Sequence, residues 1–318
     1  MRERKSGERE EPLHHIIEAQ QFSRTLLEQE LFPLTQQMAE LAVKGGDERL
    51  ADRHLFNLFY EPSTRTRISF EMAMKLLGGD VSGTENARAF SSVVKGETLE
   101  DTIRILNGYN FDVIVLRYDT EGGATRASVV SGIPVINAGD GEGQHPTQAV
   151  LDVYTIWGHF GKIDGLSVAM VGDLTYGRTV HSLAYLLGKF ENMRLFFVSP
   201  QLLRIKEGVK EYLNRHNVWY QEINSIEEVA QELDVVYMTR AQTERMDQAA
   251  RFDHKQGAYT LTREITRALP EDSIIMHPLP RNEELPDEVM NDPRVIVFRQ
   301  AQNGLYIRMA LLDMLLNP

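Results

Sequence analysis

The amino-acid sequence is organised around one stretch, Phe59-Tyr60-Glu61-Pro62-Ser63-Thr64-Arg65-Thr66-Arg67. It follows an apolar run at 55–59, which predicts a buried strand, and it precedes apolar residues at helical spacing, Ile68, Met72 and Leu76. The first backbone N–H groups of a helix have no partner inside the helix, and the helix dipole there favours negative charge. Three hydroxyls and two guanidiniums at this point therefore predict a site for a phosphate or another oxyanion.

A simpler interpretation of this turn is a helix cap, because Ser and Thr are favoured at that position and nearby arginines are often solvated. Arg65 and Arg67 weigh against it, since cations in the first turn of a helix oppose its dipole. A bound anion would compensate for both charges, so we favour the oxyanion site.

The composition sets the broad class. A chain of 318 residues is longer than one core usually supports, so we expect two domains. The net charge of −12 argues against nucleic acid and anionic membranes as partners. The absence of cysteine excludes disulfides and thiol nucleophiles, and it is typical of a cytoplasmic protein. Residues 1–12 lack the apolar core of a signal peptide, and no apolar run approaches the ~20 residues that span a bilayer, so we expect a soluble protein.

Strands and helices are expected to alternate twice along the chain. After a disordered lead-in at 1–14, we expect strands at 55–59, 113–116, 135–137, 168–171, 195–198, 219, 235–238, 274–276 and 295–298, with a helix from Leu202 among the segments between them. The apolar runs are nearly unbroken, which is typical of parallel sheets covered on both faces.

The fold class is therefore predicted as α/β, with two doubly wound parallel-sheet domains joined by a bridging helix that ends near Trp157. A final helix at 305–316 is expected to return to the first domain. The predicted domains are 15–147 together with 302–318, and 148–301.

Arginines gather at the predicted strand ends, where ligands of such sheets bind. They are Arg65, Arg67, Arg117, Arg178 and Arg240. The loop that follows the strand at 168–171 lacks the G-x-G-x-x-G spacing, so a dinucleotide site is not favoured. Bidentate arginine suits carboxylates and phosphates. The residue types alone thus predict a two-domain enzyme with two anionic substrates, one of them phosphorylated.

Several motifs resemble the aspartate/ornithine carbamoyltransferase family. They are Ser63-Thr64-Arg65-Thr66-Arg67, Gln144-His145-Pro146-Thr147-Gln148 and His277-Pro278-Leu279-Pro280. The narrower resemblance to the aspartate-specific catalytic chains rests on Val171-Gly172-Asp173, on 176–182 and on Met238-Thr239-Arg240-Ala241-Gln242. The resemblance runs from about His15 to the C-terminus. It implies transfer of a carbamoyl group from carbamoyl phosphate to L-aspartate in pyrimidine biosynthesis, without a cofactor or a metal.

The resemblance also implies roles for individual residues. The phosphate would be held by Ser63, Thr64, Arg65 and Thr66, the carbonyl oxygen would be reached by Thr66, Arg117 and His145, and the carbamoyl amide would be bound by Gln148. The catalytic set would be Arg65, Thr66, Arg117 and His145, with His145 donating a hydrogen bond rather than acting as a base. The carboxylates of aspartate would be held by Arg178, Arg240 and Gln242, and the reacting nitrogen atoms would be oriented by the carbonyls of Pro278 and Leu279.

The resemblance further implies an assembly. Ser91 and Lys95 match residues that the family lends to a neighbouring subunit, with Lys95 reaching aspartate. A homotrimer with shared active sites is implied, and the resemblance leaves open whether separate regulatory chains bind. Glu61 and Arg245 match a pair that bridges the domains on closure, although a plain surface ion pair is equally expected. Thr175 departs from relatives that have lysine there.

Two alternatives stay open. The first is an ornithine carbamoyltransferase-like enzyme, which typically carries a His-Cys-Leu-Pro and a Ser-Met-Gly motif, whereas this chain has Pro278 and no cysteine. The second is a non-catalytic carbamoyltransferase-like binding protein, which the presence of every motif residue disfavours.

Overall fold

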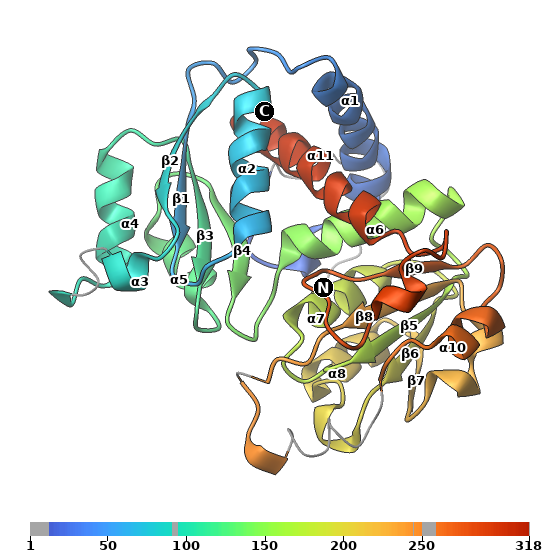
Figure 1. Cartoon of the computed structure of the whole chain (residues 1–318). Coiled ribbons are helices and arrows are strands. Elements are labelled where there is room, and N and C mark those ends of the chain that lie inside the picture. The colour runs from blue at the N-terminus through green and yellow to red at the C-terminus, as the bar shows by residue number, and fades with distance from the viewer. Residues whose placement is uncertain (1–12, 91–94, 244, 250–258, 318) are drawn as a thin grey trace.

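Two parallel α/β sheets make up the fold (Figure 1). The computed structural model describes residues 13–90, 95–243, 245–249 and 259–317. The first sheet has the strand order β2-β1-β3-β4 and the second the order β7-β6-β5-β8-β9. Neighbouring strands are parallel throughout both sheets, so the predicted α/β class is confirmed.

The first sheet consists of β1 (His54–Phe59), β2 (Asp80–Thr84), β3 (Val113–Tyr118) and β4 (Val135–Asp140). The helices around it are α1 (Phe32–Val43), α2 (Thr64–Leu76), α3 (Ala87–Phe90), α4 (Leu99–Gly108) and α5 (Gly123–Val130). Successive side chains of a strand point to opposite faces. Accordingly, Val113 and Val115 join the core beneath α1 and α2, whereas Ile114 and Leu116 pack with α4 and α5 on the other face.

The second sheet consists of β5 (Ser167–Gly172), β6 (Arg194–Val198), β7 (Trp219–Ile223), β8 (Val235–Thr239) and β9 (Ile274–Met276). One face is covered by α7 (Arg178–Leu187) and α8 (Glu207–Arg215), and the other by α10 (Arg263–Ala268) with short 3₁₀ turns. Both sheets are therefore doubly wound, as predicted.

Two helices connect the domains. The bridging helix α6 (Pro146–Phe160) runs from the first sheet to the second, and α11 (Val297–Leu316) lies against α1, α2 and α6 (Figure 1). The predicted return of the C-terminal helix to the first domain is thus confirmed. One apolar core continues from Phe32 through Tyr154 on α6 to Val168 in the second sheet.

Some sequence-based expectations about the elements are wrong. The segment 295–298 is not a strand, because α11 begins at Val297 and Val295 makes only an isolated bridge to Ile275. The helix expected from Leu202 is a 3₁₀ turn there, and α8 begins at Glu207. Strand β2 was not expected, since its Asp-Val-Ser-Gly-Thr sequence is a polar edge strand without an apolar run. Of the expected lead-in at 1–14, residues 1–12 lie outside the described residues. The exact domain boundaries stay predictions.

Candidate active site

A cavity of about 730 Å³ lies between the two domains and is lined by residues of both. Its walls include every site residue expected from the sequence apart from Ser91 and Lys95, namely Ser63, Thr64, Arg65, Thr66, Arg117, His145, Gln148, Arg178, Arg240, Gln242, Pro278 and Leu279. Ser91 lies outside the described residues, and Lys95 is exposed just before α4, away from this cavity. The structure therefore brings together residues that are more than two hundred positions apart in the chain.

The start of α2 forms one wall. Ser63 is the N-cap residue with an extended backbone, but its side chain accepts no capping hydrogen bond, and the first turn contains no acidic residue. Arg65 and Thr66 line the cavity, whereas Arg67 forms ion pairs with Glu71 and with Glu85. The expectation that both arginines of this turn need a bound anion is thus wrong for Arg67, whose charge is met by these two carboxylates.

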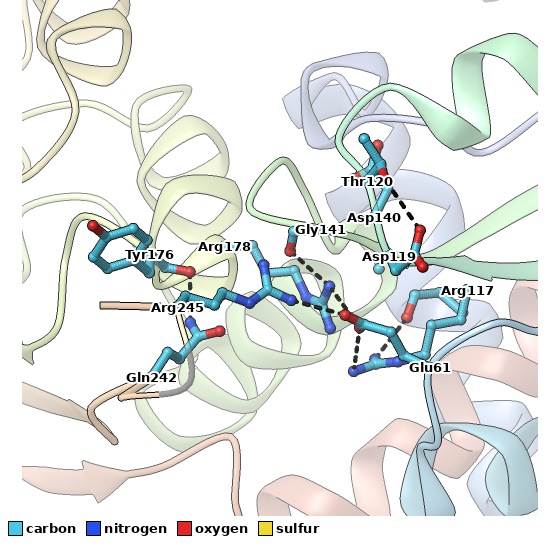
Figure 2. Close-up of polar contacts among 12 residues, drawn as sticks. Glu61, Arg117, Asp119, Thr120, Asp140, Gly141, Tyr176, Arg178, Gln242 and Arg245 are labelled. Atoms are coloured by element: carbon cyan, nitrogen blue, oxygen red, sulfur yellow. Dashed lines mark hydrogen bonds and ion pairs between the residues drawn. The ribbon is translucent and has the colours of Figure 1, made fainter. Parts of the chain in front are cut away.

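Glu61 lies among three arginines (Figure 2). Its carboxylate is 3.0 Å from Arg245 and 3.5 and 3.6 Å from Arg117 and Arg178, respectively. Burial, and then the neighbouring Arg178 charge, lowers the pKa of Arg117 to about 9; burial lowers that of Arg178 to about 10 despite the favourable Glu61 charge. Arginine stays protonated in proteins. These shifts therefore indicate buried positive charge that one carboxylate does not offset, which favours binding of an anion.

Backbone groups fix Arg178 in place. Its guanidinium donates a 2.8 Å hydrogen bond to the carbonyl of Gly141. Gly139 has φ +111°, and a Cβ built on it would lie 2.8 Å from Cζ of Arg178. A glycine is required there, because any side chain would displace the guanidinium.

Arg65 and Arg240 face the same space from opposite domains. Burial, and then the charge of Arg240, lowers the pKa of Arg65. On the side of the second domain, Asp173 accepts hydrogen bonds from the backbone N–H groups of Tyr176 and Gln242, so it ties the loop after β5 to the loop after β8. The Gln242 side chain in turn donates to the carbonyl of Tyr176. These bonds position the arginine-bearing loops.

His145 is buried at the start of α6. Burial, followed by the charges of Arg178 and Arg117, lowers its pKa well below the ordinary value. The imidazole is therefore neutral, with one ring N–H to donate. Its backbone N–H donates to Ser182, which anchors the turn to α7. A neutral histidine suits the donation of a hydrogen bond to a carbonyl oxygen.

The turn after β9 is held by His277 of the motif together with Glu284 and Gln300, which no sequence motif indicated. The Leu279 N–H donates to Nδ1 of His277 at 2.7 Å, so Nε2 carries the proton and donates to Glu284 at 2.9 Å. The His277 N–H donates to Gln300. Leu279 has φ +57°, a conformation that leucine seldom adopts. Glu284 and Gln300 thus support the turn whose carbonyls border the cavity.

The cavity walls supply guanidiniums, hydroxyls, amides and an imidazole. Within the described ranges, no group of three or more His, Asp or Glu side chains could hold a metal ion. None of the described helices is long and apolar enough to cross a membrane.

The fold and the cavity together define a class: two-domain α/β enzymes that align two small anions between their sheets. Two family models match the chain, namely the aspartate/ornithine carbamoyltransferase carbamoyl-P binding domain at 14–158 and the Asp/Orn binding domain at 164–315. The chain belongs to the aspartate/ornithine carbamoyltransferase family.

Individual relatives are similar over nearly the whole chain. The aspartate carbamoyltransferase 1, chloroplastic, of Pisum sativum is 51% identical over 306 residues, which are 96% of this chain and 79% of the relative. The catalytic subunit of Methanocaldococcus jannaschii aspartate transcarbamoylase superposes with a TM-score of 0.86 at 43% identity, covering 96% of this chain and 98% of the other. The Trypanosoma cruzi aspartate transcarbamoylase in complex with carbamoyl phosphate and aspartate gives a TM-score of 0.90 at 39% identity, covering 95% and 96%.

Proposed function

We infer that this chain transfers the carbamoyl group of carbamoyl phosphate to the amino group of L-aspartate, giving N-carbamoyl-L-aspartate and phosphate, a step of pyrimidine biosynthesis. The single observation that supports this most is the cavity itself, where the start of α2 meets arginines of the second domain. The relatives named aspartate carbamoyltransferase and the Trypanosoma cruzi complex with both substrates support the choice of aspartate over ornithine.

The carbamoyl phosphate end of the cavity is assigned to the first domain. The phosphate is held by Ser63, Thr64, Arg65 and Thr66 at the start of α2, where unpaired backbone N–H groups also point outward. The absence of an acidic residue in that helical turn supports this assignment, because nothing there competes for the guanidinium of Arg65.

Catalysis rests on positioning and on hydrogen bonds to the developing oxyanion. The carbonyl oxygen of the carbamoyl group accepts from Thr66, Arg117 and His145, and the amine of aspartate attacks as phosphate leaves. Alignment of two bound reactants can contribute ~7–11 kcal/mol, and each preorganised oxyanion donor ~3–4 kcal/mol. The neutral imidazole of His145 fits this role, since it is a donor without adding charge.

The aspartate end is assigned to the second domain. Its two carboxylates are held by Arg178, Arg240 and Gln242, which line the cavity. Lys95 of a neighbouring subunit completes the site in this proposal. The carbonyls of Pro278 and Leu279 orient the attacking amine and the carbamoyl nitrogen. The Glu61–Arg245 ion pair links the domains across the cavity and supports the assignment of these residues as a closure pair.

The assembly belongs to the same proposal: a cytoplasmic homotrimer in which Ser91 and Lys95 complete the site of the next subunit. The exposed position of Lys95, away from the cavity of its own chain, supports sharing. Mixing Lys95→Ala chains with Arg65→Ala chains tests it. Hybrid trimers should regain part of the wild-type activity, because some sites receive both residues intact. No recovery on mixing would contradict shared sites.

The reaction is tested by a radioactive carbamoyl-transfer assay with the purified protein. Labelled carbamoyl-aspartate should form from carbamoyl phosphate and aspartate, and no labelled product should form with ornithine. Product with ornithine would support the ornithine alternative, and no product with either amino acid would support the non-catalytic one.

A further inference from the structure

The side chain of Asp152 is fully buried in α6, one helical turn beyond Gln148. It accepts three hydrogen bonds. Oδ1 accepts from Nε2 of Gln148 at 3.0 Å and from Nε2 of Gln300 at 2.7 Å, and Oδ2 accepts from the hydroxyl of Tyr237 at 2.8 Å. The carboxylate thus joins the bridging helix to α11 and to β8, and neither the reaction nor the substrate contacts proposed above use it.

The direction of the Gln300 bond follows from one backbone group. The N–H of His277 can only donate, and it donates to Oε1 of Gln300 at 2.9 Å. Nε2 of Gln300 must therefore face Asp152, whose oxygen is the acceptor. Gln148 donates to the same oxygen through its Nε2, so its Oε1 is the opposite end of the amide.

Gln148 and Gln300 both line the cavity. Among the described residues, Oε1 of Gln148 has no hydrogen-bond partner, whereas its Nε2 donates to Asp152. A neutral carbamoyl NH₂ group has two N–H bonds to donate. One acceptor for it among the cavity residues is Oε1 of Gln148, and a second can come from the carbonyls of the turn at Pro278 and Leu279, which His277 anchors.

We propose that Asp152 is a positioning residue that sets the cavity's preference for a carbamoyl group over other acyl groups. It does so by fixing Gln148 with its oxygen toward the carbamoyl N–H and by linking that amide, through Gln300, to the turn that carries the second acceptor. The proposal rests on the role assigned to Gln148 under the proposed function.

The surroundings of Asp152 suit this role. It is faced by Tyr237 from β8, by Gln300 and the buried Arg308 from α11, and by Gln148 from its own helix. Burial raises its pKa to about 7. Three donors converge on two oxygens, and the deprotonated carboxylate, which forms as the pH rises through about 7, accepts all three without giving up a lone pair to a proton.

The test compares Asp152 with a matched position on the same helix. Thr155 lies three residues further along, is equally buried, and accepts a 2.9 Å hydrogen bond from Asn303 of α11. Thr155→Val therefore removes this partly buried α6–α11 bond, together with the bond from the hydroxyl to the Leu151 carbonyl, without touching Gln148. Asp152→Leu removes all three acceptor contacts, and Asp152→Asn keeps the shape with a weaker, neutral acceptor.

The readout is discrimination between carbamoyl phosphate and acetyl phosphate, which carries a methyl group where the carbamoyl NH₂ would be. We expect Asp152→Leu to lower kcat/KM for carbamoyl phosphate ~10-fold or more, and Asp152→Asn to lower it by a few fold. The inhibition constant of acetyl phosphate should stay within about twofold in both. Thr155→Val should change neither quantity.

Three outcomes overturn the proposal. The first is that the Asp152 variants weaken the use of carbamoyl phosphate and the binding of acetyl phosphate equally, and the second is that Thr155→Val loses as much kcat/KM for carbamoyl phosphate as they do. The third is that both Asp152→Asn and Asp152→Leu discriminate between the two phosphates as the wild type does. If Asp152→Leu does not fold, Asp152→Asn decides alone. Gln148→Leu separates this proposal from the site assignment. If Gln148→Leu discriminates normally, the assigned role of Gln148 is wrong; if it loses discrimination while the Asp152 variants do not, only the role of Asp152 is wrong.

Discussion

Replacing Asp152 by asparagine should change the pH dependence of stability in a direction that the structure fixes. The carboxyl has a pKa of about 7 in the folded protein, because it is buried, against 3.8 when exposed. Between these values the folded state holds a proton that the unfolded state has released. The free energy of unfolding therefore falls as pH rises through this window, and the loss levels off about one pH unit above the folded pKa of about 7.

The magnitude follows from the size of the window. Each pH unit well inside it costs about 1.4 kcal/mol, and the slope halves at the folded pKa, so the wild-type protein should lose about 2 kcal/mol between pH 5 and pH 7 through this one group. Asp152→Asn cannot ionise and lacks this loss. The asparagine variant also has weaker hydrogen bonds, but that difference does not depend on pH.

Urea unfolding of the wild type, Asp152→Asn and Thr155→Val at several pH values between about 5 and 8 measures the effect. The stability of the wild type relative to Asp152→Asn should fall as pH rises, and then level off above about pH 7. The difference between the wild type and Thr155→Val should stay constant across the range. A pH-independent difference between the wild type and Asp152→Asn would refute the reasoning, because it would mean that the carboxyl ionises normally inside the fold.

Three further substitutions test the assigned site. Arg65→Ala should lower carbamoyl transfer ~10²–10³-fold, as expected for loss of one preorganised charged donor, with an unchanged circular dichroism spectrum; a near-normal rate would count against the phosphate site. Arg240→Ala should raise KM for aspartate ~10-fold or more and leave KM for carbamoyl phosphate within about twofold, whereas equal rises would contradict an aspartate role. Glu61→Gln removes the carboxylate that lies between Arg245 and two buried arginines, so inhibition by phosphate should be unchanged or tighter while KM for aspartate rises. Glu71→Gln is the control for Glu61→Gln, because Glu71 pairs with Arg67 and does not line the cavity. Weaker inhibition by phosphate in Glu61→Gln would argue against excess positive charge at the site.

The residues that could be found from the sequence are those whose position depends on local pattern. Arg117 follows the apolar run at 113–116, and Arg178 begins the helix that follows the apolar run at 168–171. The neighbouring residues are therefore enough to predict that both arginines lie at strand ends. Parallel strands then bring those ends to one edge. The family motifs added the roles.

What the sequence did not reveal depends on contacts between distant segments. Asp152 and Gln300 are 148 positions apart, and nothing near either residue indicates that the other is its partner. Arg67 lies in the same helical turn as Arg65, and its neighbours in the sequence predict the same anion-binding role. Its charge is instead neutralised in part by Glu85, which lies directly after β2. The β-branched residues Val295, Ile296 and Val297 favour a strand at 295–298, but α11 begins at Val297, because packing of this helix against α2 and α6 overrides the local preference.

The uninterrupted apolar core that passes through α6 limits how the two halves can move. Pulling the sheets apart would expose buried side chains such as Phe32 and Tyr154 to water, at roughly 25 cal/mol for each Å² uncovered. A movement that opens or closes the cavity between the domains would instead rotate one domain relative to the other about the bridging helix α6, so that the core stays buried. For the same reason, either domain expressed alone would expose to water the apolar side chains that pack along α6.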